Sequence, residues 1–308
     1  MKKEAVKLSP EVASALAEGR PVVALESSVL AQGLPPPHNL DSWRTCERAV
    51  REAGAVPAVT ALVAGEIRAG LTSEEVDRLV APETKTRKVG VRDLAPAMAS
   101  GRWGATTVSA TCAIADAAGI ALFATGGIGG VHRGAEKTFD VSQDLATIAR
   151  SRVAVVTAGA KAILDLPKTL EVLEALGVPV VGYRTQEFPA FYTSSSGESL
   201  EQRVDDPGSA AALLRARWDV LGEGGVLFAN PIPAEAEADP EVVARAIDEA
   251  LVLADAQGIK GKAVTPYLLA EVARRSGGES LRANLALLAS NARVAAEIAV
   301  AYALRRRP

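Results

Sequence analysis

The sequence contains few cysteines and few aromatic residues. Only two of its 308 residues are cysteines, Cys46 and Cys112, and they lack the paired spacing of a zinc site. This excludes a disulfide-rich secreted fold and favours a reduced, intracellular protein. Four tyrosines, five phenylalanines and three tryptophans are too few to build the stacking platforms that bind long single-stranded nucleic acids.

Strong charge and long apolar runs are also absent. The formal net charge is −3 at pH 7, and the lysines and arginines are scattered, so no basic face for nucleic acid is expected. No uninterrupted run reaches the roughly eighteen apolar residues of a membrane span, and the N-terminal MKKEAVKLSPEV lacks the apolar core of a signal peptide. We therefore expect a cytoplasmic protein with no nucleic-acid or membrane partner.

The apolar residues that are present, 48% of the chain, fall into alternating segments. Short β-type runs predict strands at Val22–Leu25, Ala58–Val63, Thr86–Val89, Ala121–Ala124, Val153–Thr157, Val178–Tyr183 and Gly225–Ala229. Helical periodicity predicts helices at Pro10–Glu18, Leu40–Ala53, Ser73–Val80, Thr107–Ala118, Val141–Arg150, Pro167–Ala175, Ser209–Leu221, Pro240–Gln257, Pro266–Arg275 and Ser280–Leu304. This alternation predicts one α/β domain over residues 1–308, with helices on both faces of a sheet.

Two local signals refine this outline. The polar segment Phe188–Asp206 interrupts the alternation, and long ordered loops of this kind are often lids or binding loops. Thr265 followed by Pro266 predicts a helix start, with the threonine as N-cap and the proline at the first helical position.

The glycine-rich segment Thr125–Asp144, TGGIGGVHRGAEKTFDVSQD, is the most informative part of the chain. Glycines allow positive φ and let backbone N–H groups approach an anion, and the carboxylates that follow can hold a cation, so we suspect a phosphorylated ligand. The dinucleotide fingerprint G-x-G-x-x-G fails at His132, and no P-loop string occurs. The segment therefore either contacts a ligand or only reverses the chain. Asp140 has the spacing of a capping box with Gln143, so a helix cap is an alternative role for it.

Lys161 lies within VAVVTAGAKAILDL, where an apolar strand leads toward a helix. Burial favours the neutral amine, which is the form that attacks a carbonyl to make a Schiff base. The alternative is that Lys161 pairs with Asp165 one turn later on an exposed helix face.

Glu26 follows directly after the predicted strand Val22–Leu25. Ligand crevices open at the carboxyl ends of parallel strands, and a carboxyl group in apolar surroundings keeps its proton to higher pH and can act as a general acid. The alternative is a solvated glutamate or one that caps the next segment.

Nine segments, collinear over nearly the whole chain, together resemble the pseudouridine-5′-phosphate glycosidases, also called the indigoidine synthase A family. They are ALESSVLAQGLPPPHN, KVGVRDL, GATTVSAT, FATGGIGGVHRGAEKTFDVSQDL, VTAGAKAILDLPKTLE, GVPVVGY, FANPIP, TPYLL and SLRANLALLASNA. The resemblance implies an α/β fold, a three-layer α/β/α sandwich with a mixed sheet, and a homotrimer that uses a divalent cation, typically Mn²⁺. It also implies reversible cleavage of the carbon–carbon glycosidic bond of pseudouridine 5′-phosphate, giving uracil and ribose 5-phosphate.

The resemblance assigns roles residue by residue. Lys161 matches the Schiff-base lysine, Glu26 the proton donor and acceptor, and Asp140 the metal ligand. Lys88 suits a phosphate as a point charge, and Asn284 offers a donor and an acceptor for the amide edge of uracil. The remaining candidate substrate contacts are Thr107, Val108, His132, Arg133, Ser142, Gln143 and Asp144, the last expected on the same helix face as Asp140.

Two other classes of function use similar residues. A Schiff-base aldolase acting on a sugar phosphate would use the same lysine and acid without a metal. A phosphosugar-sensing protein would use Lys161 only in a salt bridge. The chain is too short to include the sugar-kinase domain fused to some family members, so a separate kinase would have to make the phosphorylated substrate.

Overall fold

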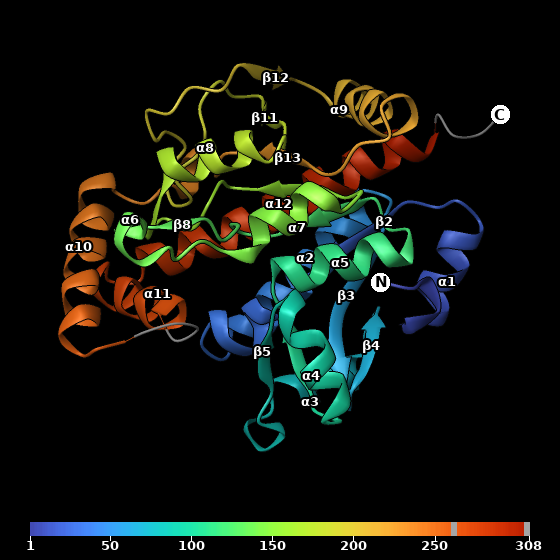
Figure 1. The fold of residues 1–308 in the computed structure, drawn as a ribbon, viewed down its shortest axis with the longest axis horizontal. Coiled ribbons are helices and arrows are strands. Elements are labelled where there is room, and N and C mark those ends of the chain that lie inside the picture. The colour runs from blue at the N-terminus through green and yellow to red at the C-terminus, as the bar shows by residue number, and fades with distance from the viewer. Residues whose placement is uncertain (260–263, 305–308) are drawn as a thin grey trace.

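The structure, a computed structural model, describes residues 1–259 and 264–304. Within these residues, a mixed, mostly parallel sheet of 11 strands forms the centre of the fold (Figure 1). Nine of the strands follow the order β1-β4-β3-β2-β7-β9-β13-β11-β12. The other two continue from β3, with β6 paired to β3 and β5 paired to β6. The antiparallel pairs are β3 with β4 and β3 with β6. The strands are β1 Val6–Leu8, β2 Val22–Leu25, β3 Val56–Val63, β4 Glu66–Ala69, β5 Arg87–Val89, β6 Gly104–Thr106, β7 Leu122–Ala124, β9 Ala154–Thr157, β11 Val180–Tyr183, β12 Gln202–Val204 and β13 Val226–Ala229. A separate antiparallel pair joins β8 Val131–His132 to β10 Leu164–Asp165.

Helices cover both faces of the sheet. They are α1 Pro10–Ala17, α2 His38–Glu52, α3 Ser73–Val80, α4 Leu94–Ala99, α5 Val108–Ala118, α6 Ala135–Thr138, α7 Gln143–Arg150, α8 Leu166–Ala175, α9 Pro207–Arg215, α10 Pro240–Ala256, α11 Val264–Arg275 and α12 Glu279–Leu304. In Figure 1, α5 and α7 lie in front of the sheet, while α2 and α12 pack together behind it. The predicted three-layer α/β/α sandwich with a mixed sheet is therefore confirmed.

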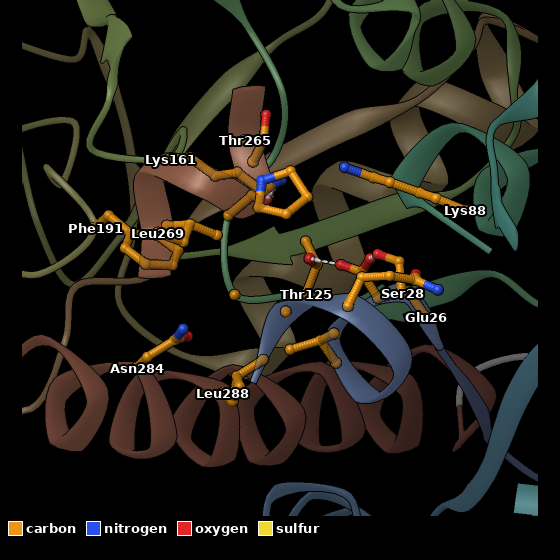
Figure 2. Close-up of a pocket in the computed structure, with 16 residues that line it drawn as sticks. Glu26, Ser28, Lys88, Thr125, Lys161, Phe191, Thr265, Leu269, Asn284 and Leu288 are labelled. Carbon is orange, nitrogen blue, oxygen red and sulfur yellow. Dashed lines mark hydrogen bonds between the residues drawn. The ribbon is translucent and has the colours of Figure 1, made fainter. Parts of the chain in front are cut away.

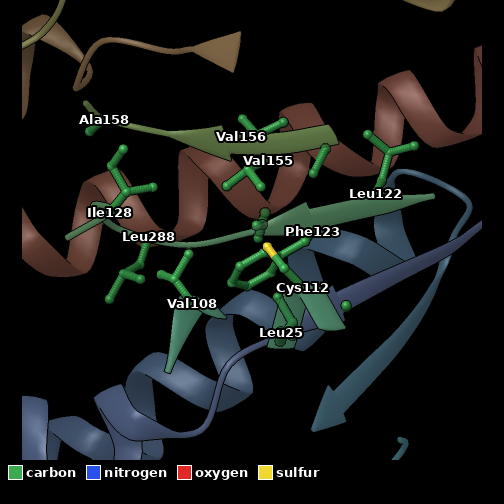
Figure 3. Packing of buried hydrophobic residues seen from close by; sticks show 14 of the residues in the cluster. Leu25, Val108, Cys112, Leu122, Phe123, Ile128, Val155, Val156, Ala158 and Leu288 are labelled. Carbon is green, nitrogen blue, oxygen red and sulfur yellow. The ribbon is translucent and has the colours of Figure 1, made fainter. Parts of the chain in front are cut away.

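The core lies between the central strands and these helices. Every residue of β2, β3, β7, β9 and β13 is buried, as expected for strands covered on both faces. Phe123 of β7, Cys112 of α5 and Leu288 of α12 belong to this packed interior (Figure 3). Burial of each large apolar side chain stabilises the fold by about 1.5–3 kcal/mol.

The long helix α12 passes through the core. By length and apolar content it is the one described helix that would suit a membrane span, but 56% of that apolar window is buried inside the fold. It packs against α2, α9 and β7, which is how a central helix of a globular protein is covered.

All seven predicted strands and all ten predicted helices are present, with ends shifted by a few residues. The sequence did not predict β1, β4, β6 or β12, which have three or four residues each. β1, β6 and β12 pair with strands that are distant in the chain, whereas β4 forms a hairpin with β3 directly before it and also pairs with the distant β1. The helix predicted to start at Thr265 and Pro266 is described from Val264, so the N-cap role predicted for Thr265 is wrong.

The sheet topology determines where a site can form. Strands β2, β7 and β9 are parallel neighbours, so their carboxyl ends meet at one edge. Glu26 follows β2, Thr125 follows β7, and the segment that leads to Lys161 follows β9. Residues 99 and 135 positions apart along the chain are thereby brought to one crevice, as is usual for parallel sheets.

Candidate active site

A cleft with two connected chambers opens at this edge of the sheet. Their volumes are about 500 Å³ and 1010 Å³, solvent at the mouths included. The smaller, apolar chamber is lined by Val29, Phe191, Pro266, Leu269, Asn284 and Leu288, among others. The larger, polar chamber is lined by Arg92, Thr107, Val108, His132, Asp140, Ser142, Gln143 and Asp144, among others. The two chambers meet at Glu26, Ser28, Lys88, Lys161 and Thr265.

Glu26 is held at the junction by hydroxyl groups. Its two carboxylate oxygens accept hydrogen bonds from Thr125 Oγ1 and Ser28 Oγ (Figure 2). The neighbouring Ser27 is fully buried and donates to the carbonyl of Thr60 at 2.6 Å. Because Leu25 is paired on both sides within the sheet and Ser27 is anchored to Thr60, the carboxyl group is fixed at the end of β2, where it lines the cleft.

Thr125 is itself fixed by the backbone. Its N–H donates to the carbonyl of Val156 at 3.0 Å, and its carbonyl accepts from Asn291 Nδ2 at 2.8 Å. Asn291 lies on α12 and is 0% exposed. This contact of Thr125 was not predicted from the sequence. Thr125 nevertheless follows β7 directly, just as Glu26 follows β2.

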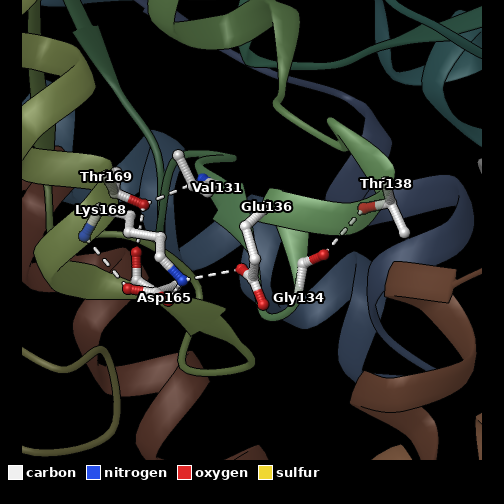
Figure 4. A network of polar contacts seen from close by, with 7 residues as sticks. All are labelled: Val131, Gly134, Glu136, Thr138, Asp165, Lys168 and Thr169. Carbon is white, nitrogen blue, oxygen red and sulfur yellow. Dashed lines mark hydrogen bonds and ion pairs between the residues drawn. The ribbon is translucent and has the colours of Figure 1, made fainter.

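Lys161 extends into the cleft from the segment after β9. Its Nζ donates to the carbonyl of Gly127 at 2.7 Å. The alternative of an exposed helical pair with Asp165 is wrong, since Lys161 precedes β10 and α8. Asp165 instead pairs with Lys168 at 2.9 Å, within a surface network that also includes Glu136 (Figure 4).

The glycine turn is shaped by close packing. None of the four glycines in Gly126–Gly130 has a positive φ, so the conformational reason expected from sequence is wrong there. A Cβ on Gly129 would lie 2.4 Å from Ser142 Oγ and 2.7 Å from Asp144 Oδ2. Glycine is needed at position 129 because the N-terminus of α7 packs directly against the glycine turn.

Asp144, in α7, connects this helix to two other parts of the polar chamber, the start of α5 and the glycine turn. It is 6% exposed, and its carboxylate accepts from the N–H groups of Ser109 and Gly129, both at 2.9 Å. The expectation that it shares a helix face with Asp140 is wrong, because α7 begins only at Gln143. Asp144 therefore ties the glycine turn to the N-terminus of α5, next to Thr107 and Val108.

Asp140 is exposed on the rim of the polar chamber. The helix-cap alternative is wrong, since the N-cap of α7 is Ser142, whose hydroxyl accepts from the N–H of Asp144 at 3.2 Å. Within residues 1–259 and 264–304, no group of three or more His, Cys, Asp or Glu side chains is placed to hold a metal ion. A single carboxylate suits a divalent cation that keeps most of its waters, and it does not suit a cage made wholly of protein ligands.

Three cationic side chains, Lys88, Arg92 and Lys161, and one histidine, His132, line the polar chamber. Burial lowers the pKa of His132, and the positive charges of Lys161 and Lys88 act in the same direction, while Asp140 opposes them. The imidazole is therefore neutral near pH 7 and can donate one hydrogen bond and accept another. Lys88 reaches the junction from β5 (Figure 2).

Not every sequence candidate lies in the cleft. Arg133 lines neither chamber and instead pairs with Asp248 of α10 at 3.1 Å, so the structure does not bring it together with the other candidates. Asn284 does line the apolar chamber, from α12, and is 7% exposed. Phe191, from the polar segment Phe188–Asp206 that the sequence marked as a candidate binding loop, also lines that chamber, as does Leu269, which carried no chemical signal in the sequence.

A family model described as indigoidine synthase A like protein matches residues 11–301. The chain belongs to the indigoidine synthase A family. A Myxococcus xanthus relative named pseudouridine-5′-phosphate glycosidase is 55% identical over 97% of this chain and 98% of its own length. A relative of the same name from Caldanaerobacter subterraneus is 52% identical, with 96% of each chain covered.

A solved structure in the indigoidine synthase A fold is also similar. The prealnumycin C-glycosynthase, crystallised in complex with ribulose 5-phosphate, is 44% identical, with a TM-score of 0.89 and 98% of each chain covered. The relatives are enzymes, and the crystallised one holds a sugar phosphate. These findings confirm the resemblance seen in the nine segments and identify this chain as an enzyme.

Proposed function

We propose that this protein reversibly cleaves the carbon–carbon glycosidic bond of pseudouridine 5′-phosphate, giving uracil and ribose 5-phosphate. The observation that carries the proposal is that the Lys161 amine and the Glu26 carboxyl both line the junction of a polar and an apolar chamber. A phosphorylated sugar and an uncharged base need these two environments side by side. The names of the relatives support the same substrate.

The bond to be broken explains why an amine is needed. It joins C1′ of the ribose to C5 of uracil, so direct departure would leave a poor carbanion on the base. If Lys161 Nζ bonds to C1′ as the C1′–O4′ bond breaks and the amine proton passes to O4′, the nitrogen lone pair of the open-chain adduct can complete a C1′=N imine as the C1′–C5 bond breaks. Glu26 gives its proton to C5 as that bond breaks, so the bond's electrons become the new C5–H bond and no free carbanion forms. Water then hydrolyses the imine, releasing ribose 5-phosphate and the free amine.

The polar chamber suits the phosphate. Lys88 supplies a positive charge, and the N-terminus of α5 at Thr107 and Val108 adds backbone polarity that favours an anion. Ser142 and Gln143, at the start of α7, and the neutral His132 supply further hydrogen-bonding groups. Asp144 contributes through the loops that it holds, because its oxygens are already engaged by backbone N–H groups.

The apolar chamber suits the base. Its walls include Phe191, Leu269 and Leu288, and Asn284 is a polar group among them. An asparagine amide can both donate to and accept from the amide edge of uracil. The base thus has an apolar enclosure with one side chain suited to reading its edge.

We include a divalent cation, Mn²⁺, in the proposal, bound by Asp140 with water as its remaining ligands. When bound there it would supply positive charge beside the sugar phosphate. We also propose that the protein is a homotrimer, as the family resemblance implies, and sedimentation of the purified protein would test this oligomeric state. We further propose that it is cytoplasmic and binds neither nucleic acid nor a membrane.

The decisive experiment is to incubate the protein with pseudouridine 5′-phosphate and Mn²⁺ and to follow free uracil by chromatography. We expect uracil and ribose 5-phosphate in equal amounts, and formation of pseudouridine 5′-phosphate when both products are supplied. Binding of ribose 5-phosphate without any release of uracil would instead favour the phosphosugar-sensing protein. Cleavage of sugar phosphates at a carbon–carbon bond within the sugar, again without uracil release, would favour the aldolase.

A further inference from the structure

Phe191 has an unusual backbone conformation. Its φ is 70°, in the left-handed region that bulky residues rarely adopt, yet its side chain is only 3% exposed. Its N–H donates to the carbonyl of Ala158 at 3.0 Å, and the ring of Tyr192 lies edge-on at 4.7 Å. Strain that the surroundings maintain in this way is concentrated at functional sites.

The ring of Phe191 packs directly against Gly127. A Cβ built on Gly127 would lie 2.6 Å from both Cδ2 and Cε2 of that ring. The φ of Gly127 is outside the left-handed region, so an alanine would fit the backbone there. The next nearest atom is the backbone nitrogen of Lys161, at 3.3 Å, so the ring of Phe191 is the main obstacle to a side chain at this position.

Gly127 is also the hydrogen-bond acceptor of Lys161. The Lys161 Nζ donates to the Gly127 carbonyl at 2.7 Å, and the Lys161 N–H donates to the carbonyl of Ile128 at 3.0 Å. The lysine is thus held at both ends by one short stretch of the glycine turn. Phe191 borders the same chamber, beside Leu269 (Figure 2).

The Phe191 segment is in turn attached to the chain that leads to Lys161. Gly159 has a φ of 89°, and a Cβ on it would lie 2.1 Å from the carbonyl oxygen of Pro189. Residues 189–191 therefore lie against residues 158–159, so that the ring of Phe191 has a fixed position relative to the lysine.

We propose that Phe191 is a positioning residue for Lys161: its ring holds the Gly127 peptide so that the carbonyl oxygen keeps the amine directed at the sugar. The inference rests on the imine-forming role given to Lys161 above. A protonated imine retains one N–H, so the same carbonyl can hold the nitrogen before and after it bonds to C1′. The ring also shields this hydrogen bond from water.

A double-mutant cycle tests the proposal. In the otherwise unchanged protein, Gly127→Ala forces the ring and the Gly127 peptide apart, and a misplacement of about 1 Å can lower kcat by about 10²-fold. In a Phe191→Ala background the added methyl group enters the space that the ring left, so the same change should cost less than about threefold. Phe191→Ala alone should lower kcat, and because Phe191 is also a wall of the base chamber, KM for pseudouridine 5′-phosphate should rise too. Ribose 5-phosphate carries no base, so its reaction with Lys161 reports on the amine alone.

The specific readout is the rate at which borohydride fixes ribose 5-phosphate to Lys161. Phe191→Ala should slow this trapping, and Phe191→Leu, which keeps most of the buried volume, should slow it less. Phe188→Ala is the matched control, since Phe188 is 0% exposed in the same segment but lines neither chamber. It should lower Tm without changing the trapping rate of the folded protein.

Equal effects of Gly127→Ala in both backgrounds would overturn the proposal, as would normal trapping in Phe191→Ala and Phe191→Leu. If Phe191→Ala does not fold, the trapping rate of Phe191→Leu becomes the deciding measurement. A rate equal to that of the unchanged protein would then overturn the proposal. Failure of the unchanged protein to release uracil is a different result, since it would overturn the proposed function itself.

Discussion

Replacing Glu26 with glutamine should remove the reactive proton while preserving the contacts that hold the side chain. The two carboxylate oxygens accept from Thr125 and Ser28. Glutamine keeps one acceptor oxygen, and its amide nitrogen can donate to the other hydroxyl, because a hydroxyl both donates and accepts. We therefore expect the free energy of unfolding to change by less than about 1 kcal/mol.

The effect on catalysis should be much larger. Positioned general acids contribute about 10²–10⁴-fold, so Glu26→Gln should lower the cleavage rate by that factor. This corresponds to about 2.7–5.4 kcal/mol of activation free energy. Binding of pseudouridine 5′-phosphate should persist, because the phosphate and base contacts do not involve Glu26.

The assay combines uracil release for kcat and KM, calorimetry for binding, and thermal unfolding. Glu66→Gln is the matched control, since it makes the same chemical change at a half-buried position of β4 that lines neither chamber of the cleft. A Glu26→Gln variant with a kcat near that of the unchanged protein would remove Glu26 from the mechanism. A fall in Tm large enough to explain the lost activity would instead give Glu26 a structural role.

Four further predictions concern other residues. Lys161→Ala should lose both cleavage and the borohydride adduct with ribose 5-phosphate yet still bind intact substrate by calorimetry; undiminished cleavage would refute this. Asp140→Ala should fold normally but lose metal-dependent turnover, so full activity after exhaustive chelation would exclude its metal role. Asp144→Ala should destabilise the fold by about 3 kcal/mol in denaturant unfolding, because two backbone N–H groups lose a charged acceptor. Burial raises the pKa of Cys46 to about 12 and that of Cys112 well above its usual value, so mass spectrometry should find neither alkylated at pH 8 before unfolding.

Local sequence determined the central strands of the sheet and the places of Glu26 and Lys161 relative to them. The strand predicted at Val22–Leu25 coincides with β2, and the apolar runs of β7 and β9 lie within the ranges predicted for them. Because strands covered on both faces are continuous apolar runs, a polar residue directly after such a run marks the strand end. Glu26 was found by that signal, and Lys161 by its isolation in an apolar segment.

The tertiary structure alone decided what those groups contact. Gly127 accepts from Lys161 over 34 positions, and Thr125 donates to Glu26 over 99. Contacts of this range depend on which strands become neighbours in the sheet, and periodicity within one segment carries no such information. For the same reason the sequence could not place Arg133 beside Asp248 and away from the cleft.

Contacts between side chains and backbone N–H groups were the other reason that predictions about the site differed from the structure. Asp144 was expected on one helix face with Asp140, but α7 begins only at Gln143, and the carboxylate of Asp144 accepts from the N–H groups of Ser109 and Gly129. Every non-proline residue carries an identical backbone N–H, so nothing in the sequence marks which ones a buried carboxylate will meet. Phe191 is a similar case, since its left-handed φ and its contact with Gly127 arise only when residues 189–191 lie against the strand end that leads to Lys161. The amino-acid sequence thus determined which residues stand at the strand ends, whereas the packing of distant segments determined how they are held.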